Sequence, residues 1–262
     1  MSRQLLLCID GGNTNVVFAL FEGQTILSQW RLSTDLKRTA DEYGVWLTNL
    51  LNLNGFNVDE IKAASIANVV PQISFQLREL SQRYFHCTPL CVESYEDVDI
   101  SVLIDNPTEV GADRLVNAVA AHHKYPGWLI VIDFGTATTL DVVRNDGAYV
   151  GGVIAPGVNL SLDALGRAAA RLPPISIKKP KKVLGQGTVS AMQSGVFWGY
   201  VSLIEGLVSR IKSELGQDAT VVATGGLASL FHDSCGVINA IDEDLTLKGL
   251  QLVYEIDGVS AK

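Results

Sequence analysis

The sequence Leu-Leu-Leu-Cys-Ile-Asp-Gly-Gly-Asn-Thr-Asn, residues 5–15, joins a short apolar run to an acidic, glycine-rich turn. A second apolar segment follows at 16–21, and after the turn Glu22-Gly23 a third covers 25–32. Short apolar runs bounded by Gly, Asn and Asp are typical of strands joined by tight turns. The chain is therefore predicted to begin with three consecutive strands.

The same pattern returns in the second half of the chain. An apolar run at 128–132 leads into Asp133-Phe134-Gly135-Thr136-Ala137-Thr138-Thr139, then into apolar residues 140–143, a turn at 145–147 and a run at 148–155. A fainter echo relates the apolar residues 63–67 and 220–223, each followed by a helix-like stretch, at 72–84 and at 227–231. This duplication favours two related α/β domains over one large sheet.

Three further helices are expected between and after these units. An Ala-rich segment at 113–125 ends at Pro126-Gly127, and amphipathic segments cover 189–215 and 245–254. We predict an N-terminal domain at 1–117 and a C-terminal domain at 118–262, with the last helix able to pack back on the first domain.

The composition bounds the class of protein. The chain has 262 residues, 47% hydrophobic and 18% charged, with a formal net charge of -8. An acidic chain is not expected to bind nucleic acid or an anionic membrane, and the first apolar run is too short for a signal-peptide core or a membrane span. The four cysteines lack the spacing of common zinc or redox sites, so we expect free thiols and a cytoplasmic protein.

The turn at Asp10-Gly11-Gly12-Asn13-Thr14 can bring several backbone N–H groups to one point. The carboxylate of Asp10 suits Mg²⁺ or a magnesium-bound water beside a phosphate. Taken alone, either turn is better explained as an ordinary hairpin. Two matching turns favour a nucleotide gripped from both sides of an interdomain cleft, whereas the Walker A and dinucleotide motifs are missing from the sequence.

The helix at 113–125 is preceded by Gly111-Ala112 and begins with Asp113-Arg114. Asp113 is a candidate general base that takes the proton of a substrate hydroxyl as it attacks a γ-phosphate; the alternative is a helix cap. Arg114 can donate a fork of hydrogen bonds to an anionic substrate, and the alternative is a surface ion pair.

Four motifs carry a resemblance to a known family. They are Asp10-Gly11-Gly12-Asn13-Thr14-Asn15, residues 106–114 (Asn-Pro-Thr-Glu-Val-Gly-Ala-Asp-Arg), residues 133–139 and Gly151-Gly152-Val153-Ile154-Ala155-Pro156-Gly157. In this order and spacing they closely resemble type III pantothenate kinases, over nearly the whole chain. The resemblance implies duplicated domains like those of actin, Hsp70 and sugar kinases (ribonuclease H-like), with a central interdomain cleft.

The resemblance also implies an activity and a set of site residues. The family makes 4'-phosphopantothenate from pantothenate and ATP, the first step of coenzyme A biosynthesis, as a homodimer with Mg²⁺ and a monovalent cation (K⁺ or NH₄⁺). By motif, Asp113 matches the catalytic base, Asp133 the monovalent-cation ligand, and Gly111, Ala112, Arg114 and Thr188 the pantothenate contacts, with Thr188 reaching the neighbouring subunit's site. The nucleotide and its magnesium match Asp10, Gly11, Gly12, Asn13, Thr14, Asn15, Gly135, Thr136 and Thr138.

The sequence leaves two alternatives open. One is a sugar or other small-alcohol kinase of the same superfamily, because a fold does not settle a substrate. The other is a non-enzymatic regulatory accessory protein, although no helix-turn-helix pattern indicates DNA binding. One departure from the family pattern is Ile104, which stands where relatives carry the Tyr of Tyr-x-Asn-Pro and affects one wall of the pantothenate pocket.

Overall fold

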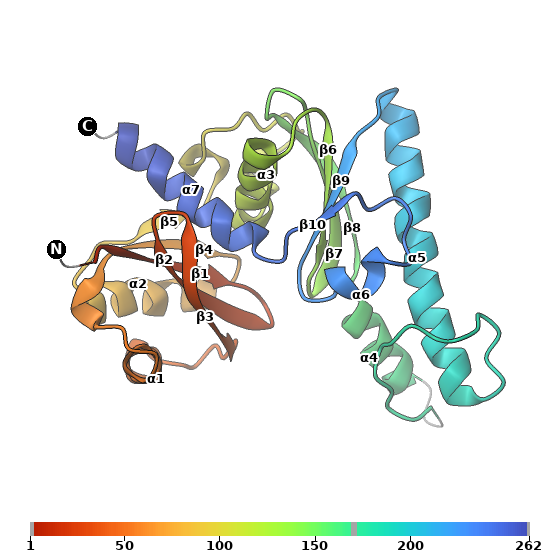
Figure 1. Ribbon diagram of the computed structural model, residues 1–262, viewed down its shortest axis with the longest axis horizontal. Helices are drawn as coiled ribbons and strands as arrows, with labels where there is room; N and C mark the ends of the chain where they lie inside the picture. The colour runs from red at the N-terminus through yellow and green to blue at the C-terminus, as the bar shows by residue number, and fades with distance from the viewer. Residues whose placement is uncertain (1–2, 169–171, 261–262) are drawn as a thin grey trace. The chain divides into compact units, whose positions relative to one another are not determined.

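The computed structural model describes residues 3–168 and 172–260. It divides into two compact units, one formed by Met1–Ala120 with Leu245–Lys262 and the other by Ala121–Asp244 (Figure 1). The chain therefore passes between the units twice, once within a helix near residue 120 and once near residue 244.

The first unit is built on a mixed sheet with the strand order β3-β2-β1-β4-β5. The three N-terminal strands form an antiparallel meander, whereas β4 pairs parallel with β1 and β5 parallel with β4. The strands are β1 (Leu5–Gly11), β2 (Asn15–Glu22), β3 (Thr25–Ser33), β4 (Ile61–Asn68) and β5 (Leu90–Val92).

Helices cover both faces of this sheet (Figure 1). On one face, α1 (Ala40–Leu53) and α2 (Pro71–Phe85) pack on a core that contains Leu7 and Phe18. On the other, α7 (Leu245–Ser260) contacts β1 and β4, and the Ser65 hydroxyl donates a 3.1 Å hydrogen bond to the backbone oxygen of Leu250. Short 3₁₀ helices lie at Val58–Glu60, Tyr95–Asp97 and Pro107–Glu109.

Local signals in the sequence set the ends of these helices. Thr39 and Glu42 form a reciprocal capping box at the start of α1. Pro71, which has no N–H to satisfy, stands at the first position of α2, and the helix ends at His86 in a left-handed conformation.

The second unit repeats the arrangement, with the strand order β10-β9-β6-β7-β8. Helices α5 (Thr188–Leu215) and α6 (Ala228–His232) cover the core face of its sheet, where Phe197 and Phe231 stack. The strands are β6 (Leu129–Phe134), β7 (Ala137–Val143), β8 (Tyr149–Pro156), β9 (Thr220–Thr224) and β10 (Ala240–Ile241), and α4 (Val158–Ala168) follows β8.

The two sheets have the same topology. In each, an antiparallel meander is followed by a parallel neighbour of the first strand and then by a short parallel edge strand. Asp10 and Asp133 lie at matching places, next to the end of the first strand of each meander. The duplication read from the sequence is therefore present in the fold.

The two segments that connect the units, near residues 120 and 244, are joined to each other by a polar contact within each unit. Within the first unit, the Thr246 hydroxyl donates to the side-chain oxygen of Asn117 at 2.8 Å. Within the second, Nζ of Lys124, at the end of α3 (Ala112–Lys124), lies 2.6 Å from a carboxylate oxygen of Asp242. In the described parts of the chain, every helix is too short or too polar to span a membrane.

Candidate active site

The loop between β1 and β2 is closed by backbone and side-chain hydrogen bonds. The N–H of Gly12 donates to the oxygen of Asn15 at 3.0 Å, and Thr34, just after β3, donates from its hydroxyl to Gly12 O at 2.6 Å and from its N–H to Thr14 O at 3.0 Å. Asn13 and Thr14 are exposed at the tip. Thr34 therefore fixes the loop that the sequence assigned to phosphate, a role that no sequence motif indicated.

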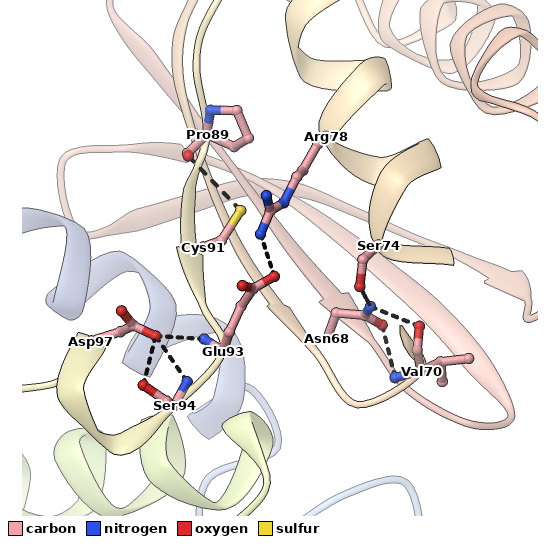
Figure 2. A network of polar contacts seen from close by, with 9 residues as sticks. All are labelled: Asn68, Val70, Ser74, Arg78, Pro89, Cys91, Glu93, Ser94 and Asp97. Atoms are coloured by element: carbon pink, nitrogen blue, oxygen red, sulfur yellow. Dashed lines mark hydrogen bonds and ion pairs between the residues drawn. The ribbon is translucent and has the colours of Figure 1, made fainter. Parts of the chain in front are cut away.

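The end of β4 is held beside this loop by an amide network (Figure 2). The side-chain nitrogen of Asn68 donates to Val70 O at 2.8 Å and to the Ser74 hydroxyl at 2.7 Å, while its oxygen accepts from Val70 N at 3.0 Å. Such a turn leads the chain directly into α2. Further along α2, Arg78 forms an ion pair with Glu93 just beyond β5, which fixes this edge of the sheet (Figure 2).

Val69 brings the first loop and the candidate base to one region of the first unit. Its N–H donates to Gly11 O at 3.0 Å. A β-carbon built at Gly111 would lie 3.4 Å from Cγ1 of Val69. The structure therefore places the end of β1 and the start of α3 on either side of this residue.

Asp113 lies in the first turn of α3, which begins one residue earlier, at Ala112. Its Oδ1 accepts a 2.7 Å hydrogen bond from the N–H of Arg114, and the N–H of Arg114 also contacts Gly111 O at 3.1 Å. Asp113 is not the N-cap residue, because the helix begins at Ala112, but its carboxylate does accept an N–H of the first turn. This position, in the first turn of a helix, is one where the partial charge of the helix terminus favours negatively charged side chains.

In the second unit, the loop between β6 and β7 is one residue tighter than its counterpart. The N–H of Gly135 donates to Ala137 O at 3.0 Å, and Gly157, after β8, donates to Thr136 O at 3.1 Å. Gly135 and Thr136 are exposed. The motifs at 133–139 and 151–157 therefore meet at this loop.

The carboxylate of Asp133 lies over the turn after β9. A β-carbon at Gly225 would come within 2.5 Å of Asp133 Oδ1, and Gly225 has a φ of +86°. Only glycine suits such a position, since it has no side chain to collide and tolerates a positive φ.

Two assigned residues have buried side chains. Ala112 is almost fully buried, so only its backbone is available to a ligand. Thr138 pairs with Phe134 across β6 and β7 and so shares the core face, and its hydroxyl has no hydrogen-bond partner within the described residues.

Thr188 opens α5 and is exposed. Several apolar side chains are exposed in the same part of the unit, on α4, in the segment before α5 and at its first turn. They are Leu160, Leu165, Val183, Leu184 and Val189. These residues leave an apolar surface around Thr188 and α4.

Comparisons with known proteins decide the family. The family model for type III pantothenate kinase matches residues 6–210. A type III pantothenate kinase from Paramagnetospirillum magneticum is 62% identical over 251 residues, which cover 95% of this chain and 96% of that protein. The chain belongs to the type III pantothenate kinase family. The resemblance seen in the sequence motifs is confirmed, and with it the enzyme class that it implied, a pantothenate kinase.

Solved structures with little sequence identity confirm the fold of this family member. The ROK hexokinase from Thermus thermophilus is 14% identical, with a TM-score of 0.53 over 98% of this chain and 100% of that one. The inorganic polyphosphate/ATP-glucomannokinase from Arthrobacter is 10% identical, with a TM-score of 0.53 over 97% and 100%. The predicted sugar-kinase-like duplication is therefore correct.

The family's site in this chain lacks a cluster of strong metal ligands. Among residues 3–168 and 172–260 there is no group of three or more His, Cys, Asp or Glu side chains that could hold a metal ion.

Proposed function

We propose that this protein transfers the γ-phosphoryl group of ATP to the hydroxyl of pantothenate, producing 4'-phosphopantothenate in the first step of coenzyme A biosynthesis. The observation that carries the proposal is the 62% identity over 95% of the chain to a protein named type III pantothenate kinase. The four sequence motifs, all present in their expected order, support it.

In this reaction Asp113 acts as the general base. Its carboxylate accepts the proton as the pantothenate O–H bond breaks, the hydroxyl oxygen bonds to the γ-phosphorus, and the bond to the β,γ-bridging oxygen breaks, leaving its electron pair on ADP. The hydrogen bond from Arg114 N fixes one carboxylate oxygen. We assign the proton transfer to this carboxylate.

Pantothenate carries a carboxylate, for which Arg114 is the matching partner. A guanidinium binds a carboxylate through parallel hydrogen bonds. We assign the remaining contacts to the backbone at Gly111 and Ala112 and to Thr188 of a second subunit. Ile104 supplies an apolar wall where relatives place a tyrosine.

ATP is assigned to the two loops that close the first hairpin of each unit. The exposed residues Asn13 and Thr14, together with Gly12, Asn15 and the end of β1 at Gly11, are assigned to the phosphates in the first loop, and the exposed residues Gly135 and Thr136 in the second. Asp10 is the carboxylate that would hold Mg²⁺ through a phosphate oxygen or a water molecule. When bound, the ion neutralises charge on the phosphates.

Asp133 is assigned to a monovalent cation, K⁺ or NH₄⁺. The chemistry of its strand neighbours fits such an ion, because the residues paired with it, Thr139 and Thr224, carry neutral hydroxyl groups. When bound, the cation offsets the negative charge that ATP and a carboxylated substrate bring together.

A homodimer with a shared active site would cover the apolar surface around α4 and the start of α5. Leu184 is 82% exposed, and four further apolar side chains are exposed on α4, just before α5 and in its first turn. Large apolar groups of this kind mark interfaces when they are contiguous. We also propose a cytoplasmic location, since all four cysteines are free thiols, as a reducing compartment requires.

The activity is tested with purified protein, ATP, Mg²⁺ and K⁺, by following phosphopantothenate formation. The Asp113→Asn variant should retain ATP binding and thermal stability but lose activity by about 10²- to 10⁴-fold, the range for a general base. Wild-type turnover in this variant would remove Asp113 from the base role. Turnover of a sugar in preference to pantothenate would assign the chain another substrate.

A mixing experiment tests the shared site. Asp113→Asn and Thr188→Val subunits are each expected to be impaired, but a mixed dimer carries one site with both native residues. Random re-association should restore about a quarter of the wild-type activity. An unchanged, additive residual activity would place Thr188 and Asp113 in the same subunit or separate them altogether.

A further inference from the structure

The two copies of the fold differ around their matching aspartates. In the first unit, Asp10 pairs with Val17 on β2 and with Ala67 on β4. Paired residues on neighbouring strands project from the same face of a sheet. The carboxylate of Asp10 is therefore flanked on its own sheet by apolar side chains only.

In the second unit, both flanking positions carry hydroxyl groups. Asp133 pairs with Thr139 on β7 and with Thr224 on β9. Its carboxylate oxygen Oδ1 lies 2.5 Å from where a β-carbon of Gly225, the residue after Thr224, would stand. Three oxygen-bearing side chains therefore stand in a row across three strands.

The hydroxyl of Thr224 is buried without a partner. The residue is 1% exposed, and within the described residues its Oγ1 makes no hydrogen bond. A buried polar atom left unsatisfied costs about 1 to 3 kcal/mol. A valine of the same shape would avoid that cost, so the hydroxyl points to a ligand that it contacts when the site is filled.

The hydroxyl of Thr139 is oriented by a hydrogen bond to the carboxylate of Asp141. It lies 2.9 Å from Oδ2 of Asp141, and the Tyr149 hydroxyl donates to Oδ1 of the same carboxylate at 2.7 Å. An ionised carboxylate only accepts, so Thr139 gives its single hydrogen to Asp141. Both lone pairs of Thr139 Oγ1 are left to accept, which suits a cation and not a phosphate oxygen.

The carboxylate of Asp141 is a second difference between the two units. Asp141 pairs with Val131, and the matching position in the first unit, paired with Cys8, is Ala19. Asp141 is fully buried. Burying a carboxylate is costly unless it is well bonded, so its presence here favours a specific task over simple packing.

We propose that Thr139 and Thr224 complete a monovalent-cation site with Asp133, and that Asp141, itself held by Tyr149, is the positioning residue that turns the Thr139 lone pairs toward the ion. This inference rests on the cation role assigned above to Asp133. One carboxylate with neutral oxygens suits K⁺ or NH₄⁺ better than a divalent ion, which takes more charged ligands.

The test compares Thr139→Val, Thr224→Val and Asp141→Asn with Thr220→Val, a control at the far end of β9. Two quantities are measured: the K⁺ concentration for half-maximal activity in a choline chloride background, and the rise in Tm that KCl produces over choline chloride without ATP. Each threonine variant should raise the K⁺ requirement by about tenfold or more, and Asp141→Asn should shift it in the same direction. All three should also shrink the Tm response.

The Ser variants at 139 and 224 keep the hydroxyl and should restore both readouts, which separates ligation from folding. Thr220→Val should behave as the wild type. Unchanged K⁺ responses in both Val variants, with a lost response in Asp133→Asn, would overturn this inference while leaving the cation role of Asp133 intact. A wild-type enzyme indifferent to K⁺ in both readouts would remove both.

Discussion

The carboxylate of Asp113 occupies the space that a side chain at residue 111 would need. A β-carbon at Gly111 would lie 2.7 Å from Asp113 Oδ1, closer than real β-carbon contacts allow. The glycine therefore does more than offer its backbone to a substrate, since its bare Cα determines where the proposed base can sit.

Gly111→Ala should displace the Asp113 carboxylate and lower kcat by about 10²-fold, because small misplacements of a reacting group have large effects on rate. KM for ATP should change little, and Tm should stay near that of the wild type. Steady-state kinetics with thermal melting checks this. Gly236→Ala is the matched control, since a β-carbon there meets nothing within 4 Å; equal activities of the two variants would contradict the prediction.

Gly249→Ala should destabilise the first unit even though alanine favours helices. The added β-carbon in α7 would lie 2.2 Å from Val116 O, so the two segments must move apart. Such overpacking costs about 1 to 3 kcal/mol, more than the gain of about 1 kcal/mol in helix propensity. Urea unfolding measures the difference, with Gly206→Ala in α5 as control, where only the end of Arg210 lies near, at 3.3 Å. A more stable Gly249→Ala protein would refute the close packing.

Lys124→Met should lower stability by about 1 to 2 kcal/mol, because it removes the cation beside a carboxylate whose side chain is 2% exposed, Asp242. The hydrogen bond to Asp242 raises the pKa of Lys124 above its usual value. A raised pKa in the folded state means that this stabilisation is complete below about pH 10 and is lost as the pH rises beyond it. The prediction fails if unfolding curves at pH 8 coincide with those of the wild type; Lys212→Met, whose partner Asp218 is exposed, should change little.

The two buried cysteines, Cys8 and Cys235, should resist alkylation in the folded enzyme. Burial raises the pKa of Cys235 to about 11 and places that of Cys8 well above its usual value. At pH 8 a thiol with pKa 11 has roughly a few hundredfold less reactive thiolate than an ordinary cysteine. Mass spectrometry after iodoacetamide treatment should find Cys8 and Cys235 modified only after unfolding in urea. Rapid labelling of either in native protein would contradict their burial.

Much of the fold was predictable because short stretches of the sequence determine the strands, the turns and most of the helices. The apolar runs and Gly-rich turns located the meanders of both units, and the helix predicted at 189–215 matches α5. The edge strands β5 and β10 were not predicted. They are only three and two residues long, too short to show the alternation of apolar and polar residues that marks a strand. The start of α3 was placed one residue late, because Asp113 is a good cap by type but Gly111 O begins the helix.

Some residues of the candidate site were likewise predictable from the sequence, and others were not. Its loops and Asp113 follow from motifs. Thr34 and Thr224 act beside residues distant in the sequence, Gly12 and Asp133. The side-chain bonds of Asn68 and Asp141 reach only two to eight residues along the chain. Only strand register reveals that Asp133 has threonine neighbours and Asp10 has not. Register depends on pairing between strands up to about ninety residues apart, which no local window of sequence contains.

The return of α7 to the first sheet affects how the protein can be made. Ser65 on β4 finds its acceptor at Leu250, so the face that α7 covers stays bare while the ribosome adds the intervening residues. The whole second unit can emerge from the exit tunnel before that face is closed. The first sheet must therefore wait, with one face uncovered, until α7 has been translated.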